Sequence, residues 1–273
     1  MDDERRSVRC RTAFISDTHL GTRGCQAERL LDFIRALDCQ TLYLVGDIID
    51  GWRLKENWYW PQAHNDIVQK ILRLARKGVR VIYIPGNHDA FGRDFVGLDF
   101  GGVAVRREAI HRGADGRSWL VTHGDDFDVA AGGSRLARAT GSLAYRALMR
   151  SHRAVGTAQR LLGFGHWSLA AFVKRHAPQA RAIIARFETA LAAEAARRGL
   201  DGVVCGHIHN PQSRTIDGVA YVNDGDWVDS CTAAVEREDG RMEVLHWPAL
   251  AAAPAAARGV SLFPESSYSP IAR

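Results

Sequence analysis

The chain has 273 residues, with 46% hydrophobic and 25% charged residues, an ordinary composition for a water-soluble globular protein. The charged start MDDERRSVRCRTAFISD lacks the apolar core of a secretory signal, and no apolar run is long enough to span a bilayer, so we expect a cytoplasmic protein. The net charge of +5 is uneven, because residues 134–198 carry +10 and the remainder −5. The five cysteines are scattered without a Cys-x-x-Cys pair, so reduced thiols are expected.

Short apolar runs alternate with helical patterns through the first 90 residues. Strands are predicted at 11–17, 41–50 and 79–89. Helices are predicted at 27–37 and 65–78, where apolar residues recur at helical spacing, and a glycine ends the second. This alternation is typical of a parallel, doubly wound α/β sheet.

Four later strands are predicted at 118–128, 202–209, 218–227 and 231–239, with hairpin turns at Asp217-Gly218 and Asp239-Gly240. We expect them to form a second, more antiparallel sheet, so that the core domain, residues 8–249, becomes a four-layer α/β/β/α sandwich. The Ala-, Leu- and Arg-rich segment 130–198 is predicted to be a helical insertion, with helices at 141–155 and 180–199. The Ala/Pro/Ser-rich tail 250–273 is expected to be loosely attached.

Side chains that bind metal ions stand at the end of most of these strands. In open α/β sheets, ligands bind off the carboxyl ends of the strands. The pairs Asp17/His19 and His207/His209 have i, i+2 spacing, so in extended chain both members leave the same face. The candidate residues are Asp17, His19, Asp47, Asp50, Asn87, His88, Asp89, His123, His207 and His209.

This mixture of carboxylates, imidazoles and one amide suits Mn, Fe, Zn or Co better than Mg or Ca, and manganese is favoured. The set is larger than one ion needs, so two ions that share a carboxylate are indicated, about 3.5–4 Å apart. Any one of these motifs alone is compatible with an ordinary turn. Their ordered occurrence at successive strand ends is what predicts a metal centre.

The blocks DTH, GDIID, GNHD, THGD and GHIH together resemble the five signature blocks of the calcineurin-like metallophosphoesterases, over about residues 11–245. The resemblance implies a hydrolase that attacks phosphate with metal-activated water and forms no covalent enzyme intermediate. It implies that His88 is the acid near the leaving group, and that Asp50 and Asp89 orient histidines or backbone. The implied ligands are Asp17, His19, Asp47 and His209 for one ion, and Asp47, Asn87, His123 and His207 for the other, with Asp47 bridging.

Within that superfamily, FISDTHLG, LYLVGDIIDGW and the long insertion before GHIH resemble the UDP-2,3-diacylglucosamine pyrophosphatases of lipid A synthesis. Those are peripheral membrane enzymes whose inserted helices cover acyl chains, which implies contact of 130–198 with the inner face of the cytoplasmic membrane. Packing of the insertion onto the core is the alternative. One position departs: those enzymes typically carry Arg where this chain has His88. Another lipid phosphate or pyrophosphate therefore stays open as the substrate.

Aromatic residues follow the second metal-binding strand: Trp52, Trp58, Tyr59 and Trp60. We predict substrate contacts from Trp52, His64 and, in the stretch GDWVDS, Asp226 or Trp227, with core packing or capping as the alternative. Hydrolysis of nucleotides or phospholipids, as a phosphomonoesterase or phosphodiesterase, remains a competing function. A nuclease would use the basic segment to hold nucleic acid. A non-catalytic scaffold like the retromer coat subunit would lack part of the ligand set, which is complete here.

Overall fold

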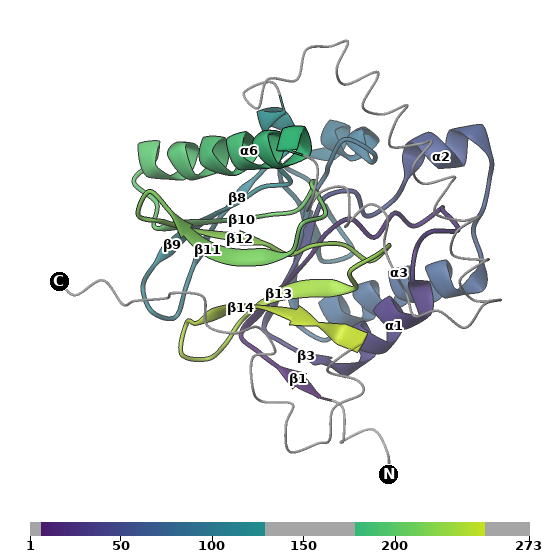
Figure 1. The fold of residues 1–273 in the computed structure, drawn as a ribbon. Helices are drawn as coiled ribbons and strands as arrows, with labels where there is room; N and C mark the ends of the chain where they lie inside the picture. The colour runs from purple at the N-terminus through teal and green to yellow at the C-terminus, as the bar shows by residue number, and fades with distance from the viewer. Residues whose placement is uncertain (1–6, 129–177, 249–273) are drawn as a thin grey trace. The chain divides into compact units, whose positions relative to one another are not determined.

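A computed structural model of the chain describes residues 7–128 and 178–248 (Figure 1). The chain separates into two compact units, one formed by Met1–Asp125 with Ala192–Arg273 and the other by Asp126–Leu191. Both sheets of the protein belong to the first unit. Among the described residues, every helix is too short or too polar to cross a membrane.

A seven-stranded sheet has the order β14-β13-β2-β4-β5-β7-β6. Its centre is parallel and consists of β2 (Thr12–Ile15), β4 (Thr41–Val45), β5 (Arg80–Ile84) and β7 (Val103–Val105). This confirms the parallel arrangement predicted from the first 90 residues. A short parallel ribbon of β1 (Val8–Arg9) and β3 (Leu37–Asp38) precedes β2 and β4.

Antiparallel strands extend this sheet at both edges. Strand β13 (Thr232–Glu236) pairs with β2, and β14 (Met242–His246) pairs with β13, while β6 (Asp99–Phe100) pairs with β7. The prediction that residues 231–239 join the second sheet is therefore wrong. The parallel strands grow from only one side of β2, so its other edge is available to β13.

The second sheet has five strands in the order β11-β12-β10-β9-β8. These are β8 (Ala109–Arg112), β9 (Ser118–Val121), β10 (Gly202–Cys205), β11 (Gln212–Ile216) and β12 (Val219–Asn223). The three central strands are parallel and only the outer pairs are antiparallel. The predicted turn at Asp217-Gly218 is confirmed, because both residues have the positive φ (49° and 83°) of a two-residue hairpin loop.

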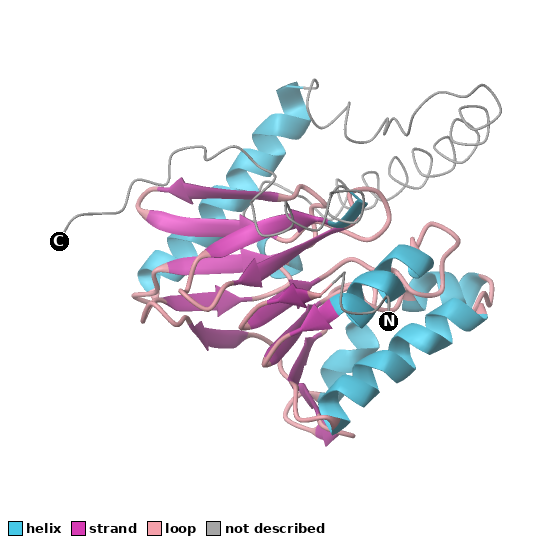
Figure 2. Ribbon diagram, turned by 90° about the horizontal axis from the view of Figure 1, so that it is seen from below, coloured by secondary structure: helices cyan, strands magenta, loops and turns pink. Residues whose placement is uncertain are grey.

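The first sheet is buried on both faces. One face packs against α1 (Ala27–Ala36) and α3 (Gln62–Arg76) through residues such as Ala13 and Leu42. The alternate residues, Phe14 and Tyr43 among them, pack against the second sheet. Figure 2 shows the strands of the sheets in magenta. The predicted helices 27–37 and 65–78 are thus confirmed, whereas the short α2 (Gly51–Glu56) and the 3-10 turns Ala90–Phe95 and Asp125–Phe127 were not predicted.

Helix α6 (Pro178–Arg197) confirms the helix predicted at 180–199, and it crosses the boundary between the two units. Its last turns belong to the unit that holds both sheets, where Ala192 and Ala195 are buried. The helix predicted at 141–155 and the tail 250–273 lie outside the described residues. The described part is the mixed α/β, two-sheet sandwich that the sequence predicted.

Candidate metal centre

The predicted ligands converge at one place because the strands that precede them are parallel within each sheet. Asp17 and His19 follow β2, Asp47 follows β4, and Asn87 follows β5. His123 follows β9, while His207 and His209 follow β10. Parallel strands end at the same edge of a sheet, so the residues that follow these strands lie close together in space.

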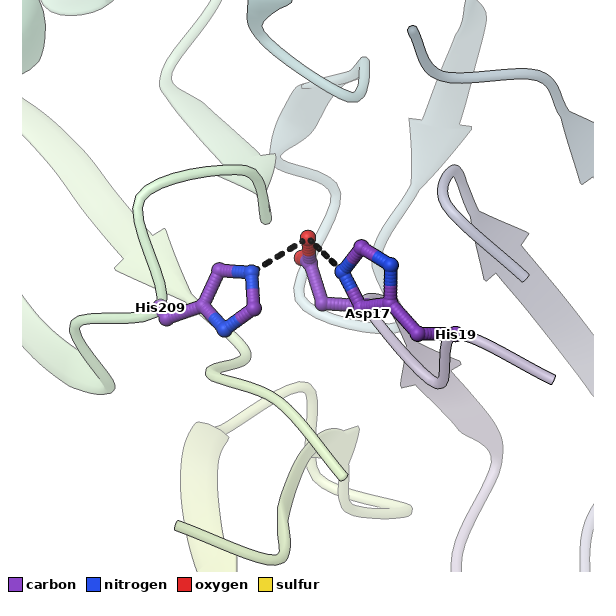
Figure 3. Close-up of side chains that lie close together, drawn as sticks. All are labelled: Asp17, His19 and His209. Atoms are coloured by element: carbon purple, nitrogen blue, oxygen red, sulfur yellow. Dashed lines mark ion pairs between the residues drawn. The ribbon is translucent and has the colours of Figure 1, made fainter. Parts of the chain in front are cut away.

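Asp17 lies between two imidazoles (Figure 3). Its Oδ1 is 3.1 Å from His209 Nε2 and 3.8 Å from His19 Nε2. The three side chains form a group whose ligand atoms could share one ion.

Asp47 lies at the centre of the neighbouring groups. Its Oδ1 is 3.5 Å from His123 Nε2, and its Oδ2 is 3.9 Å from both His19 Nε2 and His88 Nε2. Candidate metal ligands group as Asp47, His123 and His207, and also as His19, Asp47 and His88. A carboxylate with one oxygen toward each group is placed to bridge two ions, as expected for Asp47.

Several buried atoms of the set make no hydrogen bond. They are Asp17 Oδ1, His19 Nε2, Asn87 Oδ1 and His123 Nε2, and His88 Nδ1 makes none either, although it lies 3.1 Å from Asp50 Oδ2. Leaving a buried polar atom without a partner costs about 1–3 kcal/mol. Carboxylate, amide and imidazole donors are what divalent transition metals bind, and the carboxylates and imidazoles of this set group closely enough to share ions. The residues present therefore fit a pair of such ions.

The backbone at five of the ligands is in the left-handed region, which non-glycine residues adopt uncommonly. Asp17, His19, Asp47, His207 and His209 have φ between 47° and 70°. Only Asp217 and Cys231 share this conformation among the other non-glycine residues of the described chain. Such strain persists only where surrounding contacts impose it, and it concentrates at functional sites.

Asp89 supplies much of that restraint. Its buried carboxylate accepts hydrogen bonds from the backbone N–H groups of Gly86 (2.6 Å), Ile48 (2.8 Å) and Asp47 (3.2 Å). Burial and the neighbouring Asp47 raise the pKa of Asp89 above its ordinary value. These contacts make Asp89 a clamp between the loops that follow β4 and β5, as predicted for a residue that fixes backbone.

Asp50 orients two histidines at once. Its Oδ2 lies 3.2 Å from His19 Nδ1 and 3.1 Å from His88 Nδ1, and its Oδ1 caps α2 by accepting from the N–H of Arg53 at 2.9 Å. Burial opposes ionisation of Asp50, but the two imidazoles lower its pKa below the ordinary value. With both Nδ1 atoms engaged, the Nε2 atoms of His19 and His88 face Asp47.

The mutual attraction of carboxylates and imidazoles dominates the electrostatics of the site. Although burial opposes ionisation, His209 lowers the pKa of Asp17, and His123 lowers that of Asp47. Burial would lower the pKa of His19, but the nearby Asp50, Asp47 and Asp17 raise it to about 9. The pKa of His123 is raised well above its ordinary value, mainly by Asp47 against the effect of burial.

Three supporting residues had no role as supports in the sequence analysis. Asp226 lies with its Oδ2 3.7 Å from His209 Nδ1, in the position that Asp50 takes for His19. The Ser16 hydroxyl lies 2.5 Å from Asp17 Oδ2 and 2.6 Å from Asp224 Oδ1. Asp224 and Asp226 follow β12, which carries no predicted ligand, and only the GDWVDS stretch pointed to this loop.

Two predicted substrate contacts are wrong, because the residues are in the interior. Trp227 is 0% exposed and its ring packs 5.1 Å from that of Phe33. His64 is 1% exposed, and its Nδ1 accepts a hydrogen bond from the N–H of Gly21 at 3.0 Å. Trp52 is different: it is 48% exposed and its ring lies 4.2 Å from that of His88, so it remains a candidate substrate contact.

Glycines precede the ligands because the site leaves no room for a β-carbon. A Cβ on Gly86 would lie 2.6 Å from His123 Cδ2 and would collide with Asp47 Oδ1. A Cβ on Gly206 would lie 2.5 Å from Asp17 Oδ2. The glycines of GNHD and GHIH are therefore part of the metal centre, although they contribute no ligand atom.

We expect Gly86→Ala to reduce metal affinity at least about tenfold, as changes to metal-site supports commonly do, because the new methyl group displaces His123 or Asp47. Binding of Mn²⁺ should be measured by calorimetry on the metal-stripped protein. Gly97→Ala is the matched control: the added Cβ meets nothing within 4 Å, so only backbone strain at φ 95° should lower stability. Equal metal affinities in the two variants would contradict the packing role of Gly86.

Metal binding should release protons at neutral pH. His19, with its pKa raised to about 9, and His123 are protonated there in the free site, and imidazole binds a metal only when neutral. We expect proton release at pH 7 that decreases as the pH rises through about 9, the pKa of His19, and weaker metal binding as the pH falls. Calorimetry in buffers of different ionisation enthalpy measures the number of protons released. A proton release that does not change with pH would contradict it.

Comparison with known proteins agrees with this geometry. The chain is 27% identical over 255 residues to a UDP-2,3-diacylglucosamine hydrolase of Xanthomonas campestris pv. campestris, covering 84% of this chain and 96% of the relative. A protein of the same name from Porphyromonas gingivalis is 25% identical over 126 residues, covering 44% of this chain and about half (47%) of the relative. The phosphopantetheinyl hydrolase structure from Mycobacterium tuberculosis is 18% identical, with a TM-score of 0.41 over 79% of this chain and 89% of its own, a likeness too weak to carry an argument.

The family described as calcineurin-like phosphoesterase matches residues 10–211, a span that contains every predicted ligand. The matched residues and the ligand geometry identify a hydrolase of phosphate esters, and the chain belongs to the calcineurin-like phosphoesterase family.

Proposed function

We propose that this protein hydrolyses the pyrophosphate bond of UDP-2,3-diacylglucosamine or of a closely related lipid-linked or nucleotide-sugar substrate. The observation that carries the proposal is the combination of a complete dinuclear ligand set with a similarity that spans nearly the whole of a relative named for that substrate. The relative is named for that substrate. We propose the same substrate for this chain because the similarity covers 84% of this chain and 96% of the relative.

The ligand set assigns clear parts to the residues. Asp17, His19 and His209 would hold one divalent ion, and Asn87, His123 and His207 the other, with Asp47 shared between them. Such a pair supplies a hydroxide nucleophile at neutral pH and offsets the charge of the phosphate in an in-line displacement. We propose manganese for both ions, because the donor set mixes oxygen and imidazole nitrogen.

His88 is the residue placed to move a proton. Its side chain is 19% exposed, its Nδ1 is held by Asp50, and its Nε2 faces the site. From there, Nε2–H can donate to a phosphate oxygen or to the departing group. Asp50 lies beside Nδ1 of His88, and Trp52 covers one side of the ring. The part of Asp50 is thus positioning, since its oxygens are engaged by His19, His88 and the N–H of Arg53.

We further propose that the protein acts in the cytoplasm, at the inner face of the cytoplasmic membrane. The support is the charge of +10 in residues 134–198, because each Arg near anionic headgroups contributes about 1 kcal/mol of binding. Of this segment, the structure describes only residues 178–198.

His88 also favours a second candidate, hydrolysis of a phosphomonoester or phosphodiester of a nucleotide or phospholipid. An arginine at this place would bind phosphate but keep its proton, whereas a histidine can give its proton to the leaving group. An alkoxide leaving group needs such a proton more than a nucleoside phosphate leaving group does. A nuclease is weaker, because the charge of the basic segment is its sole support.

His88→Ala should lower turnover by about 10²–10⁴-fold, the usual contribution of a general acid, while the bound metal stays near two ions per chain. Steady-state kinetics and elemental analysis on the same preparation separate the two effects. His88→Arg is the matched control: it should recover phosphate affinity, seen in KM, more than kcat. If His88→Ala loses metal in proportion to activity, His88 is a ligand, as its grouping with His19 and Asp47 allows.

The proposed substrate is tested with the Mn-loaded protein against UDP-2,3-diacylglucosamine, a phosphatidic acid, a cyclic nucleotide, a chromogenic phosphodiester and single-stranded DNA. We expect the highest kcat/KM for UDP-2,3-diacylglucosamine, with UMP as a product. Asp47→Asn, which weakens the shared ligand, should abolish every activity and excludes contaminating enzymes. A preference for the phosphodiester or for DNA would overturn the substrate and leave the family assignment intact.

A further inference from the structure

Cys10 lies in the short link between β1 and β2, and Cys39 in the link between β3 and β4, at the end of the first sheet away from the ligands. Strand β1 pairs with β3 through Val8↔Leu37 and Arg9↔Asp38, and β2 pairs with β4 from Thr12↔Thr41 onward. Every one of these pairs joins residues 29 positions apart, and Cys10 and Cys39 continue that register. The N–H of Cys10 donates to Asp38 O at 3.0 Å, which holds the alignment between the two ladders.

The two side chains belong to the same hydrophobic cluster, in which Cys10 is buried and Cys39 packs at its edge. The neighbouring Cys39 and burial raise the pKa of Cys10. Neighbouring strands lie about 4.8 Å apart, and opposed residues of parallel strands point to the same face. A disulfide needs Cα atoms about 4.4–6.8 Å apart, so a pair in this register can be bridged without moving the backbone.

We propose that Cys10 and Cys39 form a redox-active dithiol that low-molecular-weight disulfides convert into an intrachain disulfide. Cys39 is half-buried and Cys10 is 2% exposed, so the reagent meets Cys39 first. The Cys39 thiolate attacks one sulfur of the reagent and releases one thiol. The Cys10 sulfur then attacks the Cys39 sulfur as its proton is lost, and the second thiol is released, so the protein loses two protons and two electrons and the reagent gains them.

The cross-link would join the two strands that deliver the ligands. Strand β2 begins two residues after Cys10 and leads to Asp17, while β4 begins two residues after Cys39 and leads to Asp47. At about 3.3 Å per residue, Cys10 and Asp17 are roughly 20 Å apart along the strand, so the bond forms outside the metal centre. It would restrict the unfolded chain by closing the loop between residues 10 and 39, and it leaves the ligand geometry as it is.

Another pair of cysteines provides an internal comparison. Cys25 precedes α1 and Cys231 precedes β13, so no strand register pairs them, and Cys231 is 0% exposed. Cys231 instead accepts a contact from Arg29 at 3.8 Å. Cys205 is 0% exposed on β10. The register argument therefore singles out Cys10 and Cys39 among the five cysteines of the chain.

The test uses the full-length, metal-loaded protein incubated with oxidised glutathione, followed by thiol counting in denaturant and peptide mapping. We expect the count to fall from five to three, a linked Cys10–Cys39 peptide, and a melting temperature raised by a few degrees that dithiothreitol reverses. Hydrolytic activity of the oxidised protein should equal that of the reduced protein.

Cys39→Ser should retain basal activity and fail to form an intrachain bond, and Cys25→Ser should form the bond as the native chain does. The substitution is made at Cys39, which is partly exposed, and the buried Cys10 is left unchanged. A count that stays at five in the folded protein, or a linked Cys25–Cys231 peptide in place of Cys10–Cys39, would overturn the proposal.

Discussion

Two buried carboxylates, Asp17 and Asp47, lie among imidazoles where the two sheets end, and the structure around them serves to hold that arrangement of charges. Burial penalises the ionised carboxylates, and the histidines offset the penalty. The backbone accepts left-handed conformations at five ligands so that the side chains converge. Glycines at 86 and 206 leave the space that this convergence requires. A pair of divalent ions would neutralise the carboxylates and satisfy the atoms that lack hydrogen bonds.

A second layer of carboxylates sets the orientation of the histidines. Asp50 faces the Nδ1 atoms of His19 and His88, and Asp226 faces that of His209. His123 is fixed differently, because its Nδ1 lies 2.8 Å from the carbonyl oxygen of Val45. In each case the outer contact is made at Nδ1 and Nε2 faces the site, which is how a protein selects the ring nitrogen that binds metal. Asp50 thereby couples a metal ligand to the proposed proton donor.

The opposite end of the same strands is built for cohesion. Buried Glu236 accepts hydrogen bonds from Arg11 (2.7 Å), Thr12 (2.8 Å) and the N–H of Ala114 (2.7 Å), and lies 2.9 Å from His111 Nε2 on the second sheet. The network ties the two sheets together near the start of β2, close in sequence to the Cys10–Cys39 pair. The five strained ligands and the four unpaired atoms of the ligand set lie at the carboxyl ends. The Glu236 network and the ligands thus lie at opposite ends of strands that are only four or five residues long.

The sequence alone determined the parallel core and both helices that cover it, and it predicted the candidate ligands, because strand periodicity and the residues that follow each strand are local properties. It did not place β13 and β14 in the first sheet, since a strand pattern does not say which open edge it will join. It assigned Trp227 and His64 to the substrate, because position near a strand end does not reveal burial. Only the tertiary structure decided these points, together with the support from Asp226 and the pairing of Cys10 with Cys39. Each depends on residues far apart in sequence whose distance is set by strand pairing and packing.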